Sequence, residues 1–452
     1  MRDLPPPNDR QKDPQLLLTF YGDDLTGSTD ALEALESRGV PSVLFTRLPS
    51  EAQRAQFSGC RALGLAGSSR SESNAWMRRE LTPTFRWLAD QGAALTHYKT
   101  CSTFDSSPHV GSIGCAMEIG HQVFGGHPVS IVVGVPQIRR YTAFGELYAN
   151  YQEQIYRIDK HPVMSCHPVT PMREADLRCH LAAQTDLPIG LIDSPSLSRE
   201  DIDRRVDDGF VEFPALLFDV LDEADQAEVG RQLWRTRPDT GAFVVGSSGV
   251  EYALMSEWRR QGIVGAPPDF LSSGEVERIA VVSGSVSSTT ARQIRWAQDY
   301  AGFCVISIDA EALADPERHD ASMSDACSKA LDAVASGRSV ILHTALGPES
   351  HRGSLSSEAS RHRLGQSLGE MLAVIIRDQQ LTRVCVAGGD TSSHAIGALD
   401  IHALRVKLPL PDTPGAPLCR AYSDNAHYNG LEIAFKGGQI GGDNFFEALR
   451  LA

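Results

Sequence analysis

Two adjacent carboxylates, Asp23 and Asp24, stand between a short apolar run and a Thr-Gly-Ser turn in the segment FYGDDLTGSTDALEALESRGV, residues 20–40. The apolar run before them predicts a buried strand, and the apolar positions after them recur at helical spacing until Gly39. A strand-to-helix turn of this kind lies at the carboxyl edge of a parallel sheet, where ligands bind. One acid can cap the helix by accepting backbone N–H bonds. Because one acid is enough for a cap, we expect the other to contact a ligand.

Further polar side chains gather in the turns of the first half of the chain. They occur in LGLAGSSRSES, THYKTCSTFDSSPHVGSIG, GVPQIRRYTAFGELY and SCHPVTPM. Arg and Lys suit a carboxylate, Arg through a two-pronged contact, whereas hydroxyls and Asp suit a polyol. The sequence therefore predicts a site for a small hydroxylated acid, formed by Arg70, Lys99, Ser102, Asp105, Arg140 and His167. A surface charge is the alternative for Arg140, and a satisfied core histidine is the alternative for His167.

Three turns of the second half combine glycine with polar residues after a strand-like run: VVSGSVSSTTARQI, VCVAGGDTSSHAIGAL and IAFKGGQIGGDNFF. Glycine lets backbone N–H groups approach a phosphate closely, and hydroxyls add donors. Three such turns in one domain favour a nucleotide site, although any one of them alone could be an ordinary tight turn. The P-loop motif and the dinucleotide-binding fingerprint are both missing from the sequence. Lys436 could contact a phosphate, but a solvated strand edge is the commoner position for a single lysine.

Alternating strand-like and helical segments position these turns. Several apolar runs are nearly continuous, as in strands that are buried on both faces, and helices are expected at 289–300, 321–335 and 356–377. The alternation predicts an α/β fold with two domains, each with a mainly parallel sheet flanked by helices. A stretch with prolines, glycines and serines at 263–280 separates them. The prediction is a sugar-acid-binding domain at 1–262 and a nucleotide-binding domain at 275–452.

Length, charge and cysteine usage exclude several classes of protein. The chain of 452 residues suits two domains, and its 42% hydrophobic and 22% charged residues are typical of a globular protein. A net charge of −15 disfavours a nucleic-acid partner. No apolar run is long enough for a membrane span, and the Pro-rich start lacks a signal peptide. Nine widely spaced cysteines favour reduced thiols in the cytoplasm over a zinc site. A monomer and a homodimer fit equally well.

Five motifs, in order along the chain, resemble those of the four-carbon acid sugar kinases: GDDLTGSTDALEALESRGV, HPVTPMREADL, VSGSVSSTTARQI, VAGGDTSSHAI and FKGGQIGGDNFF. The resemblance implies ATP-dependent phosphorylation of a hydroxyl on a short acid sugar. It also implies that the first domain holds the sugar acid and the second holds ATP. The nucleotide contacts that it implies are Ser283, Ser285, Gly388, Gly389, Asp390, Thr391 and Gly438.

The same resemblance implies in-line phosphoryl transfer. Asp23 or Asp24 then orients or deprotonates the attacking hydroxyl. Mg²⁺ is expected with ATP, held through water by a carboxylate such as Asp390.

The chain departs from the family in YKTCSTFDSSPHVGSIG, where the usual pattern is KK-x-DSTLRGNIG. Cys101 replaces an acid, Asp105 replaces an Arg, and Ser68 replaces an Asp of the preceding turn. An anion in place of a cation should change which acid is recognised. The resemblance thus favours a branched or oxidised acid, such as an oxo-isoapionate, over the common tetronates. Two alternatives remain open at this point: a sugar-acid-phosphate lyase or isomerase, and a non-catalytic sugar-acid sensor.

Overall fold

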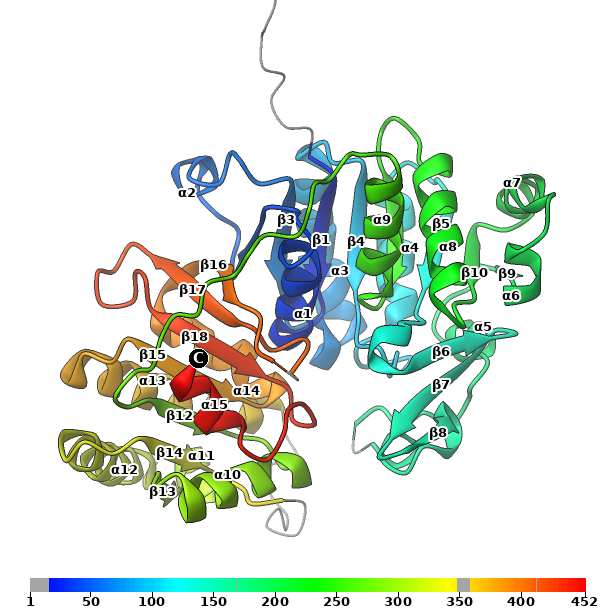
Figure 1. Ribbon diagram of the computed structural model, residues 1–452. Helices are drawn as coiled ribbons and strands as arrows, with labels where there is room; N and C mark the ends of the chain where they lie inside the picture. The colour runs from blue at the N-terminus through cyan, green and yellow to red at the C-terminus, as the bar shows by residue number, and fades with distance from the viewer. Residues whose placement is uncertain (1–15, 168, 348–357, 412) are drawn as a thin grey trace, which may run out of the picture.

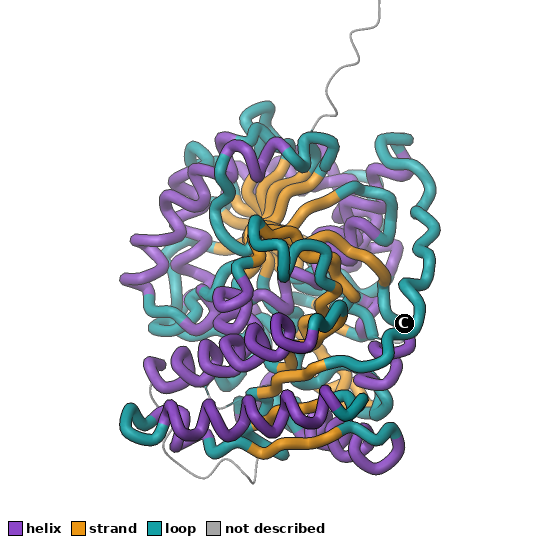
Figure 2. The backbone as a smooth tube through the Cα atoms, turned by 90° about the vertical axis from the view of Figure 1, so that its left-hand side faces the viewer, coloured by secondary structure: helices purple, strands orange, loops and turns teal. Residues whose placement is uncertain are grey.

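A computed structural model describes residues 16–167, 169–347, 358–411 and 413–452 (Figure 1). Its strands form one fifteen-stranded sheet and one separate three-stranded sheet. Figure 2 shows the large sheet as a continuous twisted layer with helices on both sides. The predicted α/β class is confirmed. The sequence did not reveal that the sheets of the two halves join into one.

The first half of the chain contributes eight parallel strands to the large sheet, in the order β2-β3-β1-β4-β11-β5-β10-β9. The strand β1 pairs with both β3 and β4, so the turn after β1 lies at the centre of this half. These strands are β1 (Leu18–Gly22), β2 (Ser42–Phe45), β3 (Ala62–Ala66), β4 (Leu95–Lys99), β5 (Val129–Val132), β9 (Ile189–Ile192), β10 (Ala215–Phe218) and β11 (Ala242–Gly246).

The second half contributes five parallel strands, in the order β13-β14-β12-β15-β18, and two antiparallel strands that lead to the first half. The junction is the antiparallel pairing of β16 with β2, with Leu404 opposite Leu44. The sequence analysis missed this antiparallel seam. The strands are β12 (Ala280–Ser283), β13 (Cys304–Ser307), β14 (Val340–His343), β15 (Arg383–Ala387), β16 (Ile401–Leu408), β17 (Leu418–Ser423) and β18 (Glu432–Lys436).

Helices cover both faces of the sheet (Figure 1). The three helices expected from the sequence correspond to α10, α12 and α13, except that residues 356 and 357 lie outside the described residues. The helices of the first half are α1 (Leu25–Glu36), α2 (Glu51–Ala55), α3 (Asn74–Asp90), α4 (Ile113–Val123), α5 (Leu177–Ala182), α6 (Ser194–Leu197), α7 (Ile202–Glu212), α8 (Glu223–Thr236) and α9 (Gly249–Arg260). Those of the second half are α10 (Ser288–Tyr300), α11 (Ala310–Ala314), α12 (His319–Ala335), α13 (Glu358–Gln379), α14 (Gly389–Ala395) and α15 (Phe445–Leu451).

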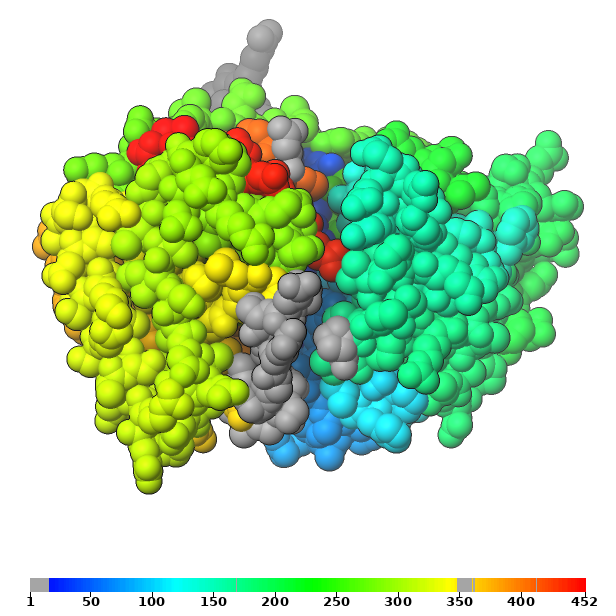
Figure 3. All heavy atoms as spheres, turned by 90° about the horizontal axis from the view of Figure 1, so that it is seen from below, coloured from blue at the N-terminus to red at the C-terminus, as the bar shows by residue number. Residues whose placement is uncertain are grey.

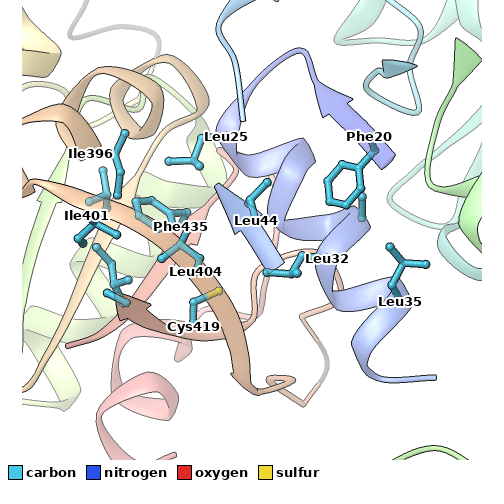
Figure 4. Close-up of a cluster of buried hydrophobic side chains, with 14 of the residues drawn as sticks. Phe20, Leu25, Leu32, Leu35, Leu44, Ile396, Ile401, Leu404, Cys419 and Phe435 are labelled. Atoms are coloured by element: carbon cyan, nitrogen blue, oxygen red, sulfur yellow. The ribbon is translucent and has the colours of Figure 1, made fainter. Parts of the chain in front are cut away.

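The hydrophobic core differs between the two faces of the sheet. On one face a single cluster of buried side chains runs through both halves. Figure 4 shows it at the seam, where Phe20 and Leu44 of the first half share a layer with Leu404 and Phe435 of the second. On the other face the second half has a cluster of its own, whereas the cluster of the first half includes Ala403 of β16 and packs against Tyr422 of β17. Because burial of apolar surface is the main stabilising term, the two halves are joined chiefly by the cluster that runs through both of them.

A small antiparallel sheet lies next to the first half, below the carboxyl ends of its strands in Figure 1. It consists of β6 (Arg140–Ala143), β7 (Glu146–Tyr151) and β8 (Gln154–Arg157), which the sequence analysis did not predict. A bridge between Thr142 and Val220 fastens it to the loop after β10. Among the described helices, none is long and apolar enough to cross a membrane.

Candidate functional site

The acidic turn after β1 meets a glycine turn of the second half. The backbone N–H of Leu25 donates to Ser393 Oγ at 3.1 Å. A Cβ placed on Gly389 would lie 3.6 Å from Asp24 Oδ2 and 3.7 Å from Thr26 Oγ1, so this glycine faces the acid at van der Waals contact distance. Figure 3 shows a cleft between the two halves, with the blue of the N-terminal segment at its floor. Both predicted sites therefore border the same cleft.

Asp24 is the acid that caps α1. Its backbone is extended, with φ −140 and ψ 164, and its Oδ1 accepts from the N–H of Gly27 at 2.5 Å and from Thr26 Oγ1 at 3.1 Å. Its other oxygen, Oδ2, accepts from Arg70 Nη1 at 3.0 Å. The carboxylate is thus held from three sides.

Asp23 is the acid that the cap leaves free. Its side chain is buried, and no hydrogen bond among the described residues reaches its Oδ1. Burial, reinforced by the charge of Asp24, raises the pKa of Asp23 to about 7, against the opposing effects of Arg70 and Lys99. A carboxyl group with a pKa near neutrality and an unsatisfied oxygen is suited to accept a proton.

Arg70 and Asp105 form the centre of a buried network. Arg70 Nη2 donates to both oxygens of Asp105, at 2.9 and 3.0 Å. Thr103 Oγ1 donates to Asp105 Oδ1 at 2.5 Å, and Thr170 Oγ1 donates to Oδ2 at 2.7 Å. Burial alone would raise the pKa of Asp105, but Arg70, His167 and the two hydroxyls hold it at about 2. Asp105 is therefore a fixed anion that neutralises Arg70.

Lys99 lies on the other side of the acid pair. It is buried, and its Nζ forms an ion pair with Asp30 at 3.1 Å and donates to the carbonyl of Thr100. A Cβ placed on Gly27 would lie 2.9 Å from Asp24 Oδ1, 3.5 Å from Lys99 Nζ and 3.8 Å from Asp23 Oδ1. Glycine at this position leaves a small space that is lined by two acids and a cation.

The remaining sugar-side residues lie in neighbouring turns. Ser102 is half-buried in the turn after β4. His167 is half-buried, and burial lowers its pKa despite the nearby Asp105; its Nδ1 accepts from the backbone N–H of Thr170 at 3.1 Å. The charge of Asp390, on α14, also opposes the effect of burial on the pKa of His167. Arg140 is half-buried at the first position of β6.

Two of the glycine turns are joined by hydroxyl contacts. Ser285 Oγ donates to Thr290 Oγ1 at 3.1 Å, and Thr290 Oγ1 donates to the carbonyl of Gly438 at 2.9 Å. The N–H of Ser285 lies 3.4 Å from Ser283 Oγ. A Cβ placed on Gly438 would lie 3.1 Å from Ser285 Oγ. The predicted nucleotide contacts Ser283, Ser285 and Gly438 thus lie together.

The third glycine turn packs beside them. Gly388 has a φ of 118, which is strained for any residue with a side chain, and a Cβ there would lie 2.9 Å from Thr391 Oγ1 and 3.3 Å from Ser285 N. Gly389 begins α14, Thr391 is buried, and Asp390 is exposed in the first turn of the helix. All seven predicted nucleotide contacts therefore lie at adjacent turns.

The expectation of a solvated position for Lys436 is wrong. Its side chain is fully buried, and its Nζ donates to Thr290 Oγ1 at 3.2 Å and to the carbonyl of Gly437 at 2.8 Å. Burial lowers its pKa to about 8, and no described carboxylate offsets that burial. The ammonium group stands among the residues that join two glycine turns.

The sequence analysis did not assign Thr103 and Asp30, which complete the sugar-side network. The spacing of Thr103 two residues before Asp105 could have indicated the first contact. The ion pair of Asp30 with Lys99 could have been found only from the packing of α1 against β4. Within the described part of the chain, no group of three or more His, Cys, Asp or Glu side chains could hold a metal ion.

Two family models match the chain, one in each half. A family model described as a sugar-binding N-terminal domain matches residues 18–254. A second, described as a nucleotide-binding C-terminal domain, matches residues 280–446.

Two relatives and one solved structure are similar to the chain over almost its whole length. A 3-oxo-isoapionate kinase of Paraburkholderia graminis is 44% identical, over 96% of this chain and 94% of that protein. A 3-oxo-tetronate kinase of Pseudomonas fluorescens is 29% identical, over 96% of each. A crystal structure from Salmonella typhimurium LT2, 23% identical, shares the fold with a TM-score of 0.74 over 96% of this chain and 98% of that one. The chain therefore belongs to the four-carbon acid sugar kinases, as its five motifs suggested.

Proposed function

We propose that this protein transfers the γ-phosphoryl group of ATP to a hydroxyl of 3-oxo-isoapionate or a closely related branched oxo acid. The observation that carries the proposal is the meeting of Asp24 with Gly389, because it sets the acid pair against the glycine turns across one cleft. The 44% identity with a 3-oxo-isoapionate kinase supports the substrate class. The departures at Cys101 and Asp105 from the common pattern support it as well.

The proposed division of labour follows the two edges of the cleft. Residues up to 262 hold the acid sugar, with Arg70, Lys99, Ser102, Asp105, Arg140 and His167 around it. Residues from 275 hold ATP at Ser283, Ser285, Gly388, Gly389, Asp390, Thr391 and Gly438. All nine cysteines are free thiols, which supports a reducing compartment such as the cytoplasm. A monomer or a homodimer can carry this site, since both edges belong to one chain.

Asp23 is the proposed base. As the hydroxyl oxygen bonds to the γ-phosphorus, the bond from that phosphorus to the ADP oxygen breaks, and the hydroxyl proton moves to Asp23. Asp24 orients the attacking hydroxyl. Its carboxylate is fixed because it caps α1 and pairs with Arg70. Two negative side chains at one edge would repel a triphosphate, but Arg70 and Lys99 offset their charge.

The residues of the second half fit a nucleotide. The backbone N–H of Ser285, which makes only a 3.4 Å contact with Ser283 Oγ, the hydroxyls of Ser283 and Thr391, and the buried Lys436 supply donors and a positive charge. Gly388, at a φ of 118, lets these turns approach closely. Exposed Asp390 could hold Mg²⁺ through water. When bound, Mg²⁺ neutralises charge on the phosphates.

The test is coupled ADP release with Mg-ATP across tetronates, 2- and 3-oxo-tetronates and branched apionate derivatives. We expect one strong responder among the branched oxo acids. ADP release with a tetronate alone would overturn the substrate class. Absence of release, together with no ATP effect on the melting temperature, would favour a lyase or isomerase. Binding of the acid without turnover would favour a sensor.

A further inference from the structure

Two of the three cations on the sugar side already have carboxylate partners. Arg70 donates to Asp24 at 3.0 Å and to Asp105 at 2.9 Å, and Lys99 pairs with Asp30 at 3.1 Å. Breaking a buried ion pair to bind another anion is costly, because it leaves a charge without compensation. These two cations therefore orient other groups of the site more readily than they capture a carboxylate.

Arg140 differs from both. Its Nη1 donates only to backbone carbonyls, those of Ile138 at 3.1 Å and Arg139 at 3.2 Å, with Asn150 at 3.5 Å. Its Nε is buried and has no partner among the described residues. No described carboxylate lies among the charges that act on its titration, and burial lowers its pKa. A guanidinium binds an anion best through two parallel N–H bonds to a carboxylate, and Arg140 makes no such contact with a described residue.

The position of Arg140 brings it to the cleft. The segment 133–139 leaves the carboxyl end of β5, and Arg139 turns the chain with a φ of 57 before β6 begins. In the sheet, β5 is separated from β4 only by β11, so this turn lies at the same edge as the turn after β4. Cys101 of that turn is close enough to act on the titration of Arg140. Cys101 acts in the same way on Arg70 and Lys99, so the turn after β4 lies within electrostatic range of all three cations.

The register of the small sheet separates the Arg140 side chain from that of Asn150, the other residue there with an unsatisfied buried atom. Arg140 pairs with Ala149, so these two side chains share one face of the sheet and the side chain of Asn150 lies on the other. Only the backbone of Asn150 is adjacent, because its carbonyl accepts from Arg140 Nη1 at 3.5 Å. Buried polar atoms are nearly always satisfied, so the free Nε of Arg140 indicates a ligand that accepts hydrogen bonds. A carboxylate is the acceptor that a guanidinium binds best.

We propose that Arg140 binds the carboxylate of the acid sugar. The inference rests on the proposed function and deepens it. The small sheet β6–β8 then selects the acid, whereas Arg70, neutralised by Asp105, positions Asp24.

The test compares R140M and R140K with R139M. Arg139 is the matched control because it is adjacent, exposed and 3.9 Å from Glu153. We expect R140M to raise KM for the acid sugar at least 30-fold and to leave KM for ATP unchanged. The preference for the acid over the same compound with –CH₂OH in place of its carboxylate should collapse in R140M and be partly restored in R140K. R139M should stay within twofold of the wild type.

A second variant guards against a folding defect in R140M. R140Q removes the charge and keeps donors for the carbonyls of Ile138 and Arg139, so it should keep the fold and raise KM for the acid sugar as R140M does. If R140M or, should it not fold, R140Q keeps the wild-type KM and the preference for the acid, the inference is wrong while the kinase function stands. If the wild type releases no ADP with any acid of the panel, both are wrong.

Discussion

The two edges of the cleft carry different types of residue. The sugar-side edge carries three buried acids, Asp23, Asp24 and Asp105. Arg70 pairs with Asp24 and Asp105, and Lys99 pairs with a fourth acid, Asp30. The nucleotide-side edge carries glycines and hydroxyls, and its deeply buried charge, Lys436, has no described carboxylate partner.

The difference follows from what each edge must bind. A triphosphate brings its own negative charge, so its site needs donors and few anions. A hydroxyl that is to be phosphorylated brings no charge, and the site must supply a base for it. A base has to be kept from pairing permanently with a cation, and the network around Asp24 and Asp105 occupies Arg70 so that Asp23 remains free.

The largest expected effect comes from removing the base. D23N should lower kcat by a factor of about 10² to 10⁴, the usual contribution of general base catalysis. In the wild type, kcat should fall as the pH drops below about 7, because the pKa of Asp23 is raised to about 7. The measurement is the pH profile of coupled ADP release for both proteins.

D24N is the matched control for D23N. Asn still caps a helix, so this change removes only the charge that faces Arg70. We expect a smaller loss of kcat than in D23N and a lower melting temperature.

The stability of the fold should respond to Asp23 in the opposite direction. Its pKa in the fold lies above the ordinary value of 3.8, so its contribution to stability is full below about pH 4 and is lost as the pH rises through 7. D23N should therefore melt a few degrees higher than the wild type at pH 8. A larger kcat loss in D24N would reverse the two roles.

The next effect concerns the buried cation of the nucleotide edge. K436M should weaken ATP binding by roughly 10- to 100-fold, since a hydrogen bond to a charged group contributes about 1.5–3 kcal/mol. The pKa of Lys436 is lowered to about 8, so the wild type should lose ATP affinity as the pH rises above 8, and K436M should not. Isothermal titration with ATP at pH 7 and pH 9 measures the affinity and its pH dependence.

K329M, at an exposed site on α12, is the control. Equal pH dependence in the wild type and K436M would place the charge away from the phosphates.

Two neighbouring glycines sharpen the comparison further. G388A forces a side chain onto a φ of 118 and against Thr391 and Ser285, so it should cost about 1–3 kcal/mol and abolish thermal stabilisation by ATP. G389A meets only ordinary contacts, at 3.6 and 3.7 Å, across the cleft. It should melt like the wild type and yet lower kcat/KM, because the added methyl occupies space between the two edges. If G389A were fully active, the reacting groups would lie elsewhere in the cleft.

Much of the fold could be predicted because parallel strands and their helices leave local signals. Buried parallel strands appear as nearly continuous apolar runs, and α10 and α12 have helical spacing between them. The antiparallel strands β16 and β17 were missed because their sequences, with Arg405, Lys407 and Arg420, are partly polar. Their pairing with β2 is a long-range contact that no local pattern encodes.

The candidate site divides in the same way. The turns that carry Asp23, Gly388 and Ser285 could be placed at strand ends from the sequence, because turn residues mark them. The state of each side chain could not. Whether Asp23 or Asp24 caps the helix depends on backbone angles, and the burial of Lys436 depends on Thr290, almost 150 residues away in the chain. Partners that are distant in sequence decide which charges are free.

The smallest expected effect tests whether the two edges are coupled at all. S393A removes the acceptor of the Leu25 N–H. Leu25 is buried but Ser393 is half-buried, so a water molecule can take the place of the lost hydroxyl, and the cost should be only about 1 kcal/mol. S392A is the matched control, because Ser392 Oγ donates within its own turn, to the carbonyl of Gly388 at 2.7 Å.

The measurement compares the melting temperatures of the three proteins with ATP, with the acid sugar and with both. In the wild type and S392A, the two ligands together should stabilise the protein by more than the sum of their separate effects. In S393A the excess should shrink, because the contact that joins the edges is gone. An excess of equal size in all three proteins would mean that the edges act independently and that the shared apolar core at the seam, rather than this hydrogen bond, holds them in register.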